Sequence, residues 1–127
     1  MAVILDTNAV SGLFRGDAAL EKVLAAEERH QLPVIVVGEY RFGLARSRAR
    51  QQLRDLLDQL IAESDVLEVD LETASVYAEI RARLRERGEP IPENDIWIGA
   101  LCLQHRVALV SRDAHFDSIR GLQRWTW

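Results

Sequence analysis

The chain has 127 residues, a length typical of one domain, and its 48% hydrophobic and 28% charged residues fit an ordinary globular protein. Its net charge of −4 argues against a general nucleic-acid coat, and its longest apolar stretch, residues 96–103, is far shorter than the ~20 residues of a membrane span. Cys102 is the only cysteine, which excludes an internal disulfide and fits a reducing compartment. We therefore expect a cytoplasmic protein with a single domain over residues 1–127.

The first half of the chain alternates short apolar runs with longer periodic ones. Residues 2–5 predict a buried strand, and residues 17–29 predict a helix whose first residue, an aspartate, is the N-cap. A second β-branched run at residues 34–37 predicts another strand, and a helix follows it as far as Arg46. Residues 48–62 carry leucine and isoleucine at helical spacing and predict an amphipathic helix.

The second half continues the alternation. A short strand is predicted at residues 65–70, a helix at 71–87, a further helix at 95–105 and a strand at 107–111. Residues 122–127 predict a last edge strand. Strands that alternate with helices indicate βαβ crossovers, and hence a mostly parallel sheet with helices on both faces.

Four acidic residues lie near the ends of these predicted elements. Asp6 and Asp113 follow apolar strands, Glu39 follows the run at residues 34–37, and Asp95 begins a helix. Ligands of such sheets bind at the carboxyl ends of the strands, where these acids would converge. Carboxylates that converge resist ionising together, and a bound divalent cation removes that conflict. Hard oxygen ligands favour Mg²⁺ or Mn²⁺, and no Cys/His cluster suggests another metal site.

Each acid also has a purely structural interpretation. Asp6 could cap the short helix that follows it, and Asp113 could cap a turn. Asn94 or Asp95 could cap the helix that ends at residue 105. Glu39 could lie in the first turn of its helix, where the helix dipole favours negative charge. Both interpretations stay open for each residue, but their recurrence at one edge of the sheet favours a common site.

The residues around these acids resemble a known family. The motifs "LDTN", "GEYRFGL", "PENDIWIGA" and "LVSRDAHFD" resemble those of PIN-domain ribonucleases, in the same order, and most closely those of the VapC toxins of bacterial toxin–antitoxin pairs. The resemblance spans essentially the whole chain. It implies a three-layer α/β/α sandwich with a mostly parallel central sheet.

The resemblance also implies an activity and a metal site. Family members are metal-dependent endoribonucleases that hydrolyse RNA phosphodiester bonds with a Mg²⁺-activated water, with Mn²⁺ as a substitute, and leave 5′-phosphate and 3′-hydroxyl ends. Four acids at these motif positions hold the metal, and the positions here are Asp6, Glu39, Asp95 and Asp113.

Several neighbouring residues would support that site. The resemblance implies that Thr7, Asn8 and Ser111 orient the acids, with Ser111 standing where the family has threonine. Asp117 could support the site from behind or could be a plain surface acid. Trp97 and the isoleucine after it are expected to pack in the core rather than to stack on bases.

The partners that the resemblance implies are an RNA substrate and a cognate VapB-type antitoxin. The antitoxin would inhibit the toxin by inserting a basic side chain among the acids, and promoter DNA would be bound only through the antitoxin complex. A homodimer through the helices around residues 40–62 is expected. Lys22 is the only lysine among 16 basic residues, and Arg41, Arg46 and Arg48 could hold the RNA backbone.

Rival functions fit the sequence less well. A response-regulator receiver needs a lysine after a late strand, whereas the only lysine lies in an early helix. A haloacid-dehalogenase-like enzyme needs a second aspartate two residues after the first, and Asn8 stands there instead. A PIN fold that serves only as a binding module remains open, although all four acids are retained.

Overall fold

The computed structural model describes residues 1–127. The elements of its first half are β1 (Ala2–Leu5), α1 (Thr7–Phe14), α2 (Ala18–Ala25), β2 (Arg29–Pro33), α3 (Val34–Leu44) and α4 (Arg50–Glu63). Those of its second half are β3 (Asp65–Leu67), α5 (Leu71–Glu86), α6 (Glu93–His105), β4 (Ala108–Val110), the 3₁₀ helix η1 (Ala114–Ser118) and β5 (Arg124–Trp125).

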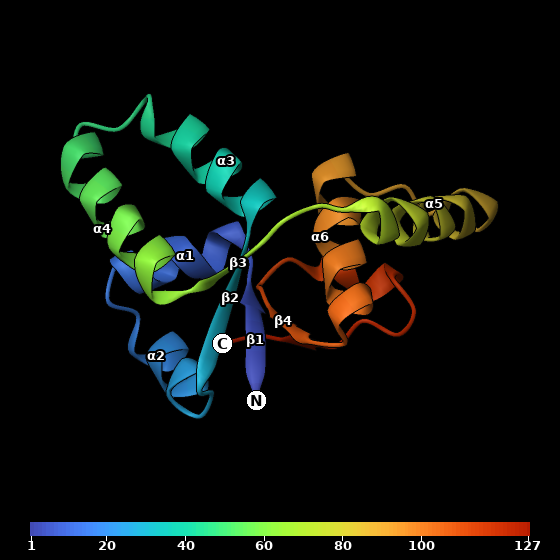
Figure 1. The fold of residues 1–127 in the computed structure, drawn as a ribbon, viewed down its shortest axis with the longest axis horizontal. Helices are drawn as coiled ribbons and strands as arrows, with labels where there is room; N and C mark the ends of the chain where they lie inside the picture. The colour runs from blue at the N-terminus through green and yellow to red at the C-terminus, as the bar shows by residue number, and fades with distance from the viewer.

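The five strands form one fully parallel sheet in the order β3-β2-β1-β4-β5. Strand β1 is central, and its residue Ile4 pairs with Gln31 on one side and Leu109 on the other. Helices α1 to α4 lie to one side of the strands and α5 and α6 to the other (Figure 1). The predicted three-layer α/β/α architecture is confirmed, and all strands deliver their carboxyl ends to the same edge.

The position of β1 in the core explains why its sequence is an uninterrupted apolar run. Val3, Ile4 and Leu5 are all fully buried, as a strand covered on both faces requires. They belong to a cluster of 26 buried apolar residues that joins the sheet to the helices on both sides. Strand β5 lies at one border of the sheet, which confirms the predicted edge strand near the C-terminus.

The prediction of a strand at residues 34–37 is wrong. The second strand is β2, which ends at Pro33, and α3 begins at the next residue. A short apolar run cannot be assigned to helix or strand by periodicity alone, and β-branched residues favour strands only when they meet a sheet. The buried positions Val36, Val37, Tyr40 and Leu44 have helical spacing. Glu39 therefore lies within α3 rather than just beyond a strand.

The earlier start of the second strand also makes the preceding helix shorter than predicted. Helix α2 ends at Ala25, not at residue 29, because the chain from Arg29 onward pairs with β1. Asp17 is its N-cap as predicted, since its side chain accepts hydrogen bonds from the N–H groups of Ala19 and Leu20.

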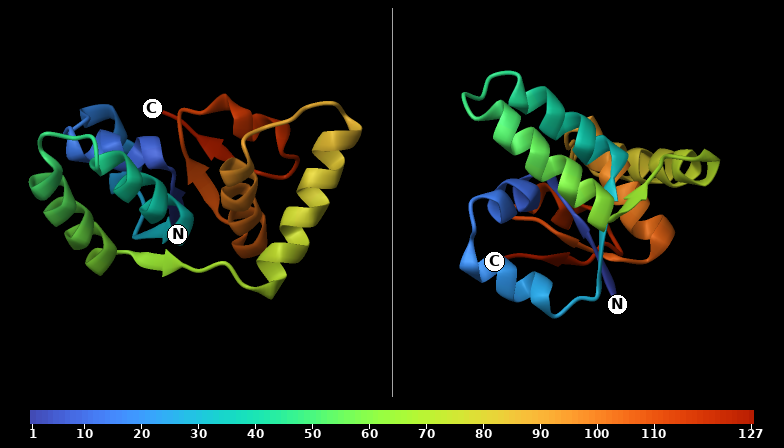
Figure 2. Two further views of the ribbon diagram at one scale, coloured as in Figure 1. Left: turned by 90° about the horizontal axis from the view of Figure 1, so that it is seen from above. Right: turned by 60° about the vertical axis from the view of Figure 1, so that its left-hand side comes forward.

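None of the helices is both long and apolar enough to cross a membrane. Figure 2 shows that the α3–α4 hairpin and the α5–α6 pair project from opposite sides of the sheet.

Candidate active site

Asp6 lies at the carboxyl end of the central strand and is buried. One oxygen, Oδ1, accepts a 2.8 Å hydrogen bond from the N–H of Thr7 and so caps α1. The other, Oδ2, accepts a 2.6 Å hydrogen bond from the hydroxyl of Ser111. Burial raises the pKa of Asp6, and the charge of Asp113 raises it further, although these two hydrogen bonds act against the shift. Asp6 is thus both a helix cap and a member of the acidic group.

Ser111 and Asn8 tie the end of β1 to the loop after β4. The Ser111 hydroxyl, fully buried, accepts hydrogen bonds from the Asp113 N–H at 3.0 Å and from Asn8 Nδ2 at 3.3 Å while it donates to Asp6. Asn8 Oδ1 accepts from the N–H of Arg112 at 3.2 Å. These bonds hold two acids from distant parts of the sequence in one place.

Glu39 approaches the same place from α3. The hydroxyl of Thr7 lies 3.4 Å from Glu39 Oε1 and donates to it, so Thr7 links α1 to α3. Burial raises the pKa of Glu39, and the charge of Asp6 raises it further, while the side chains of Thr7 and Asn94 lower it. Glu39 lies in the second turn of α3, so the alternative placement in the first turn is wrong.

Asp95 comes from the first turn of α6 and is buried. The residue at the N-cap position is Pro92, so neither Asn94 nor Asp95 caps the helix. Burial, followed by the charges of the other three acids, raises the pKa of Asp95 to about 6. The charges of the other three acids act on Asp95 because nearby like charges disfavour the ionised form of a carboxyl group.

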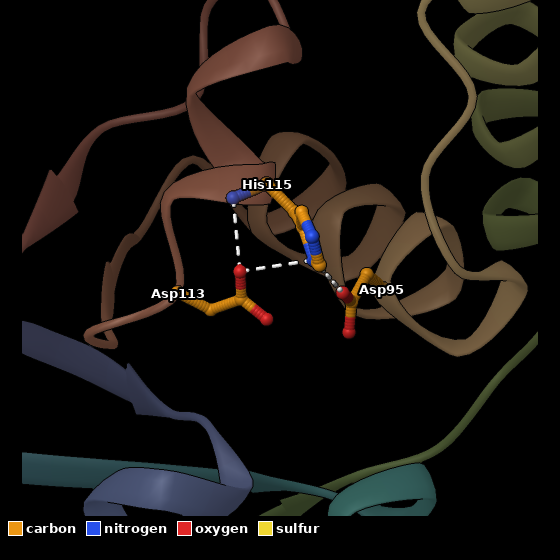
Figure 3. A group of neighbouring side chains, drawn as sticks. All are labelled: Asp95, Asp113 and His115. Carbon is orange, nitrogen blue, oxygen red and sulfur yellow. Dashed lines mark hydrogen bonds and ion pairs between the residues drawn. The ribbon is translucent and has the colours of Figure 1, made fainter.

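Asp113 completes the group, and His115 accompanies it. Asp113 Oδ1 accepts a 2.9 Å hydrogen bond from the N–H of His115 and caps η1. The ring of His115 turns back over the acids, with Nδ1 2.9 Å from Asp113 Oδ1 and 3.4 Å from Asp95 Oδ2 (Figure 3). One ligand atom from each of these three residues lies within 4.8 Å of the other two. The sequence reasoning missed His115, although it stands two residues after Asp113 inside a quoted motif.

The remaining predicted residues lie outside the acidic group. Asp117 binds Arg124 through two 2.8 Å contacts, and Arg124 in turn donates to the carbonyl of Ser111 at 3.1 Å. Trp97 stacks on Tyr77 of α5, with ring centroids 3.9 Å apart, so it packs between helices.

The three arginines proposed to hold RNA are on the α3–α4 hairpin. Arg41 lies on α3 beside Arg54 of α4, in a surface hollow. The guanidinium of Arg46 lies 6.0 Å from the ring centroid of the exposed Phe42. Arg48 is exposed in the connection between the two helices. None of the three forms an ion pair with an acid of the site.

Comparison with known proteins identifies the family. The PIN domain profile matches residues 3–122. The chain belongs to the PIN-domain family. This PIN domain is 31% identical over 130 residues to the VapC ribonuclease Y4jK of Sinorhizobium fredii, which covers 94% of this chain and 93% of that protein. The chain is therefore a PIN domain of the VapC ribonuclease type.

Solved structures share the fold. VapBC2 from Rickettsia felis, bound to a DNA fragment from its promoter, has a TM-score of 0.88 at 22% identity and covers 100% of this PIN domain and 99% of that chain. VapBC-5 from Mycobacterium tuberculosis, a member of the VapBC family of toxin–antitoxin systems, has a TM-score of 0.77 at 24% identity. It covers 98% of this PIN domain and 96% of that chain.

The chemistry of the acidic group fits a divalent cation. No lysine or arginine forms an ion pair with Asp6, Glu39, Asp95 or Asp113. Burial and the charges of neighbouring acids raise the pKa of Asp6, Glu39 and Asp95, so ionisation of these acids is unfavourable without a compensating cation. A bound cation would supply that compensation, and the donor set of carboxylate oxygens is the kind that divalent ions take.

Proposed function

We propose that this PIN domain is a metal-dependent endoribonuclease and the toxin of a VapBC-type toxin–antitoxin system. The observation that carries the proposal is the group of four acids from separate parts of the chain, to which no lysine or arginine is paired. Asp6, Glu39, Asp95 and Asp113 would hold Mg²⁺, or Mn²⁺ in its place. Its identity as a VapC-type PIN domain supports RNA as the substrate.

The residues divide the work of phosphodiester hydrolysis. The ion, when bound, would lower the pKa of the attacking water and neutralise charge on the phosphate. One of the carboxylates would also accept the proton of the attacking water. Ser111, Asn8 and Thr7 hold the acids in place through the hydrogen bonds described above. Products with 5′-phosphate and 3′-hydroxyl ends are expected.

RNA must reach an acidic site in a protein of net charge −4. The α3 helix that carries Glu39 also carries Arg41, and Arg46 and Arg48 follow it in the chain. These three arginines would bind phosphates that flank the scissile bond, because guanidinium groups pair with phosphate through two hydrogen bonds. Such contacts make binding weaken as salt rises.

The VapBC complexes with the same fold support a cognate VapB-type antitoxin as the regulator. Its basic side chain would compete with the cation for the acids, and a segment that folds on binding can cover a large surface. Promoter DNA would be contacted only through that complex. A homodimer would form through α3 and α4, where Phe42 is 74% exposed on a helix face. A cytoplasmic location fits this role.

Cleavage of total RNA by the purified, antitoxin-free protein tests the proposed activity. Wild type should give discrete fragments with Mg²⁺ or Mn²⁺ and none with EDTA, and Asp6→Asn should give none with either ion. Asp65→Asn is a matched control because Asp65 begins β3, at the opposite edge of the sheet, and pairs with Arg29. It should cleave like wild type.

Fragments that persist in EDTA, or normal cleavage by Asp6→Asn, would contradict the metal assignment. A folded wild-type protein that cleaves no RNA under any of these conditions would instead favour a binding module. Sequencing the fragment ends of an active preparation would identify the RNA target and the chemistry of the cut.

A further inference from the structure

His115 supplies the one nitrogen atom in the acidic group that could bind a metal ion. Its Nδ1 atom lies 2.9 Å from Asp113 Oδ1 and 3.4 Å from Asp95 Oδ2 (Figure 3). The side chain is 54% exposed, so packing against the core does not force it toward the acids. What places it there is the 3₁₀ turn, which Asp113 caps by accepting the N–H of His115 itself. The same aspartate therefore fixes the backbone and receives the ring.

The spacing of these atoms suits ligands of one ion. Ligands about 2.1 Å from a small divalent cation in octahedral geometry lie about 3 Å apart when they are adjacent. The two distances from Nδ1 bracket that value, and one atom from each of the three residues lies within 4.8 Å of the others. His115 can thus join Asp95 and Asp113 in one coordination sphere after only a small adjustment of its ring.

We propose that His115 is a nitrogen ligand of the metal, so that this site selects a first-row transition-metal ion, with Mn²⁺ as the probe, over Mg²⁺. The inference rests on the proposed metal-dependent function and reverses the order of ions expected from four carboxylates alone. Mg²⁺ is a hard ion that takes oxygen ligands and dehydrates reluctantly, whereas first-row transition-metal ions accept imidazole beside carboxylates.

A different role for His115 makes the opposite prediction. A positively charged imidazole between Asp95 and Asp113 would stand in for the cation and would have to leave when metal binds. Removal of the ring would then strengthen the binding of both ions. If His115 is a ligand, its removal weakens the binding of Mn²⁺ much more than the binding of Mg²⁺.

The test is metal binding rather than cleavage. Calorimetric titration of wild type and His115→Ala with Mn²⁺ and with Mg²⁺ gives the affinity ratio of the two ions. Loss of even an outer partner of a metal ligand reduces affinity by about 10- to 100-fold, so loss of a ligand should lower the Mn²⁺ affinity at least about tenfold. The Mg²⁺ affinity should change much less.

Pulsed electron paramagnetic resonance of bound Mn²⁺ gives an independent readout. Wild type should show coupling to a directly bound ¹⁴N nucleus, and His115→Ala should lose it. His105→Ala, which removes an exposed histidine at the end of α6, should keep both the coupling and the affinity ratio.

The outcomes distinguish failure of the metal site itself from failure of the ligand role of His115. Wild type that binds neither ion would overturn the four-carboxylate metal site, and the role of His115 with it. Binding of both ions with an unchanged ratio in His115→Ala, tighter binding of both, or no ¹⁴N coupling in wild type would overturn the ligand role alone. Those three results would leave the four-carboxylate site standing.

Discussion

Replacement of Asp95 by asparagine should stabilise the metal-free protein while it abolishes metal-dependent cleavage. The pKa of Asp95 rises from its ordinary value of 3.8 to about 6, chiefly because of burial and then because of the charges of Asp6, Asp113 and Glu39. At about 1.4 kcal/mol for each pH unit, the ionised carboxylate lowers the free energy of unfolding by about 3 kcal/mol. Asparagine keeps the shape and removes the charge.

The pH dependence of this gain has a definite sign. Below pH 3.8 Asp95 is protonated in both the folded and the unfolded chain, so its charge carries no penalty. Between pH 3.8 and about 6 the folded protein holds a proton that the unfolded chain has lost, and the free energy of unfolding of wild type falls as pH rises. Above about 6 the penalty is complete. Asp95→Asn should therefore match wild type near pH 4 and exceed it at pH 8.

Urea denaturation in EDTA at pH 4 and pH 8 measures the difference. At pH 8 the gain should approach about 3 kcal/mol, or about 10 °C in Tm for a domain of this size. Mn²⁺ or Mg²⁺ should then raise the Tm of wild type and leave that of Asp95→Asn unchanged, because only a folded state that binds the ion is stabilised by it.

Asp65→Asn is the control for this measurement, since it removes an acid from an exposed ion pair with Arg29 and should lose at most about 1 kcal/mol. A variant no more stable than wild type at pH 8, or a gain that is undiminished at pH 4, would refute the electrostatic reasoning.

Three further outcomes are expected. Ser111→Ala removes the hydroxyl that donates to Asp6 and accepts from the Asp113 N–H; it should lower metal affinity by about 10- to 100-fold in calorimetry, and Ser111→Thr should restore most of it. Arg106→Gly relieves a left-handed backbone (φ of 56°) at the end of α6 and should raise the free energy of unfolding by about 1 kcal/mol in urea titration; a loss would contradict the assigned strain. Replacing Arg41 and Arg46 by alanine should reduce the slope of log affinity for single-stranded RNA against log salt by about 0.7 per lost phosphate contact, and an unchanged slope would place the RNA elsewhere.

The sequence predicted most of the fold because most of its signals are local. The leucine spacing of α4 specifies a helix on its own. The run at residues 34–37 does not, because valine and isoleucine there serve equally well in a buried helix. Only the pairing of Arg29 with Ala2 and of Gln31 with Ile4 decides that the strand comes earlier, and this pairing is a long-range fact.

The candidate site was predictable to the extent that it depends on strand ends. Asp6 and Asp113 follow β1 and β4 and had to meet at the carboxyl edge of a parallel sheet. His115 was not predictable in the same way, since its position depends on a five-residue 3₁₀ turn that reverses the chain and directs the ring back. A lone histidine two residues from an acid carries no signal of that turn.

The structural and the functional interpretations of the acids are compatible, because a carboxylate has two oxygens. Oδ1 of Asp6 accepts a hydrogen bond from the first N–H of α1, and Oδ2 accepts one from the hydroxyl of Ser111. The cap therefore fixes the direction of the side chain, and the positive end of the helix dipole stabilises negative charge there. Asparagine is as good an N-cap as aspartate, whereas alanine forfeits about 1 kcal/mol at such a position. Asp6→Asn therefore removes the charge while it keeps the cap, and loss of cleavage in that variant reports on the site rather than on the fold.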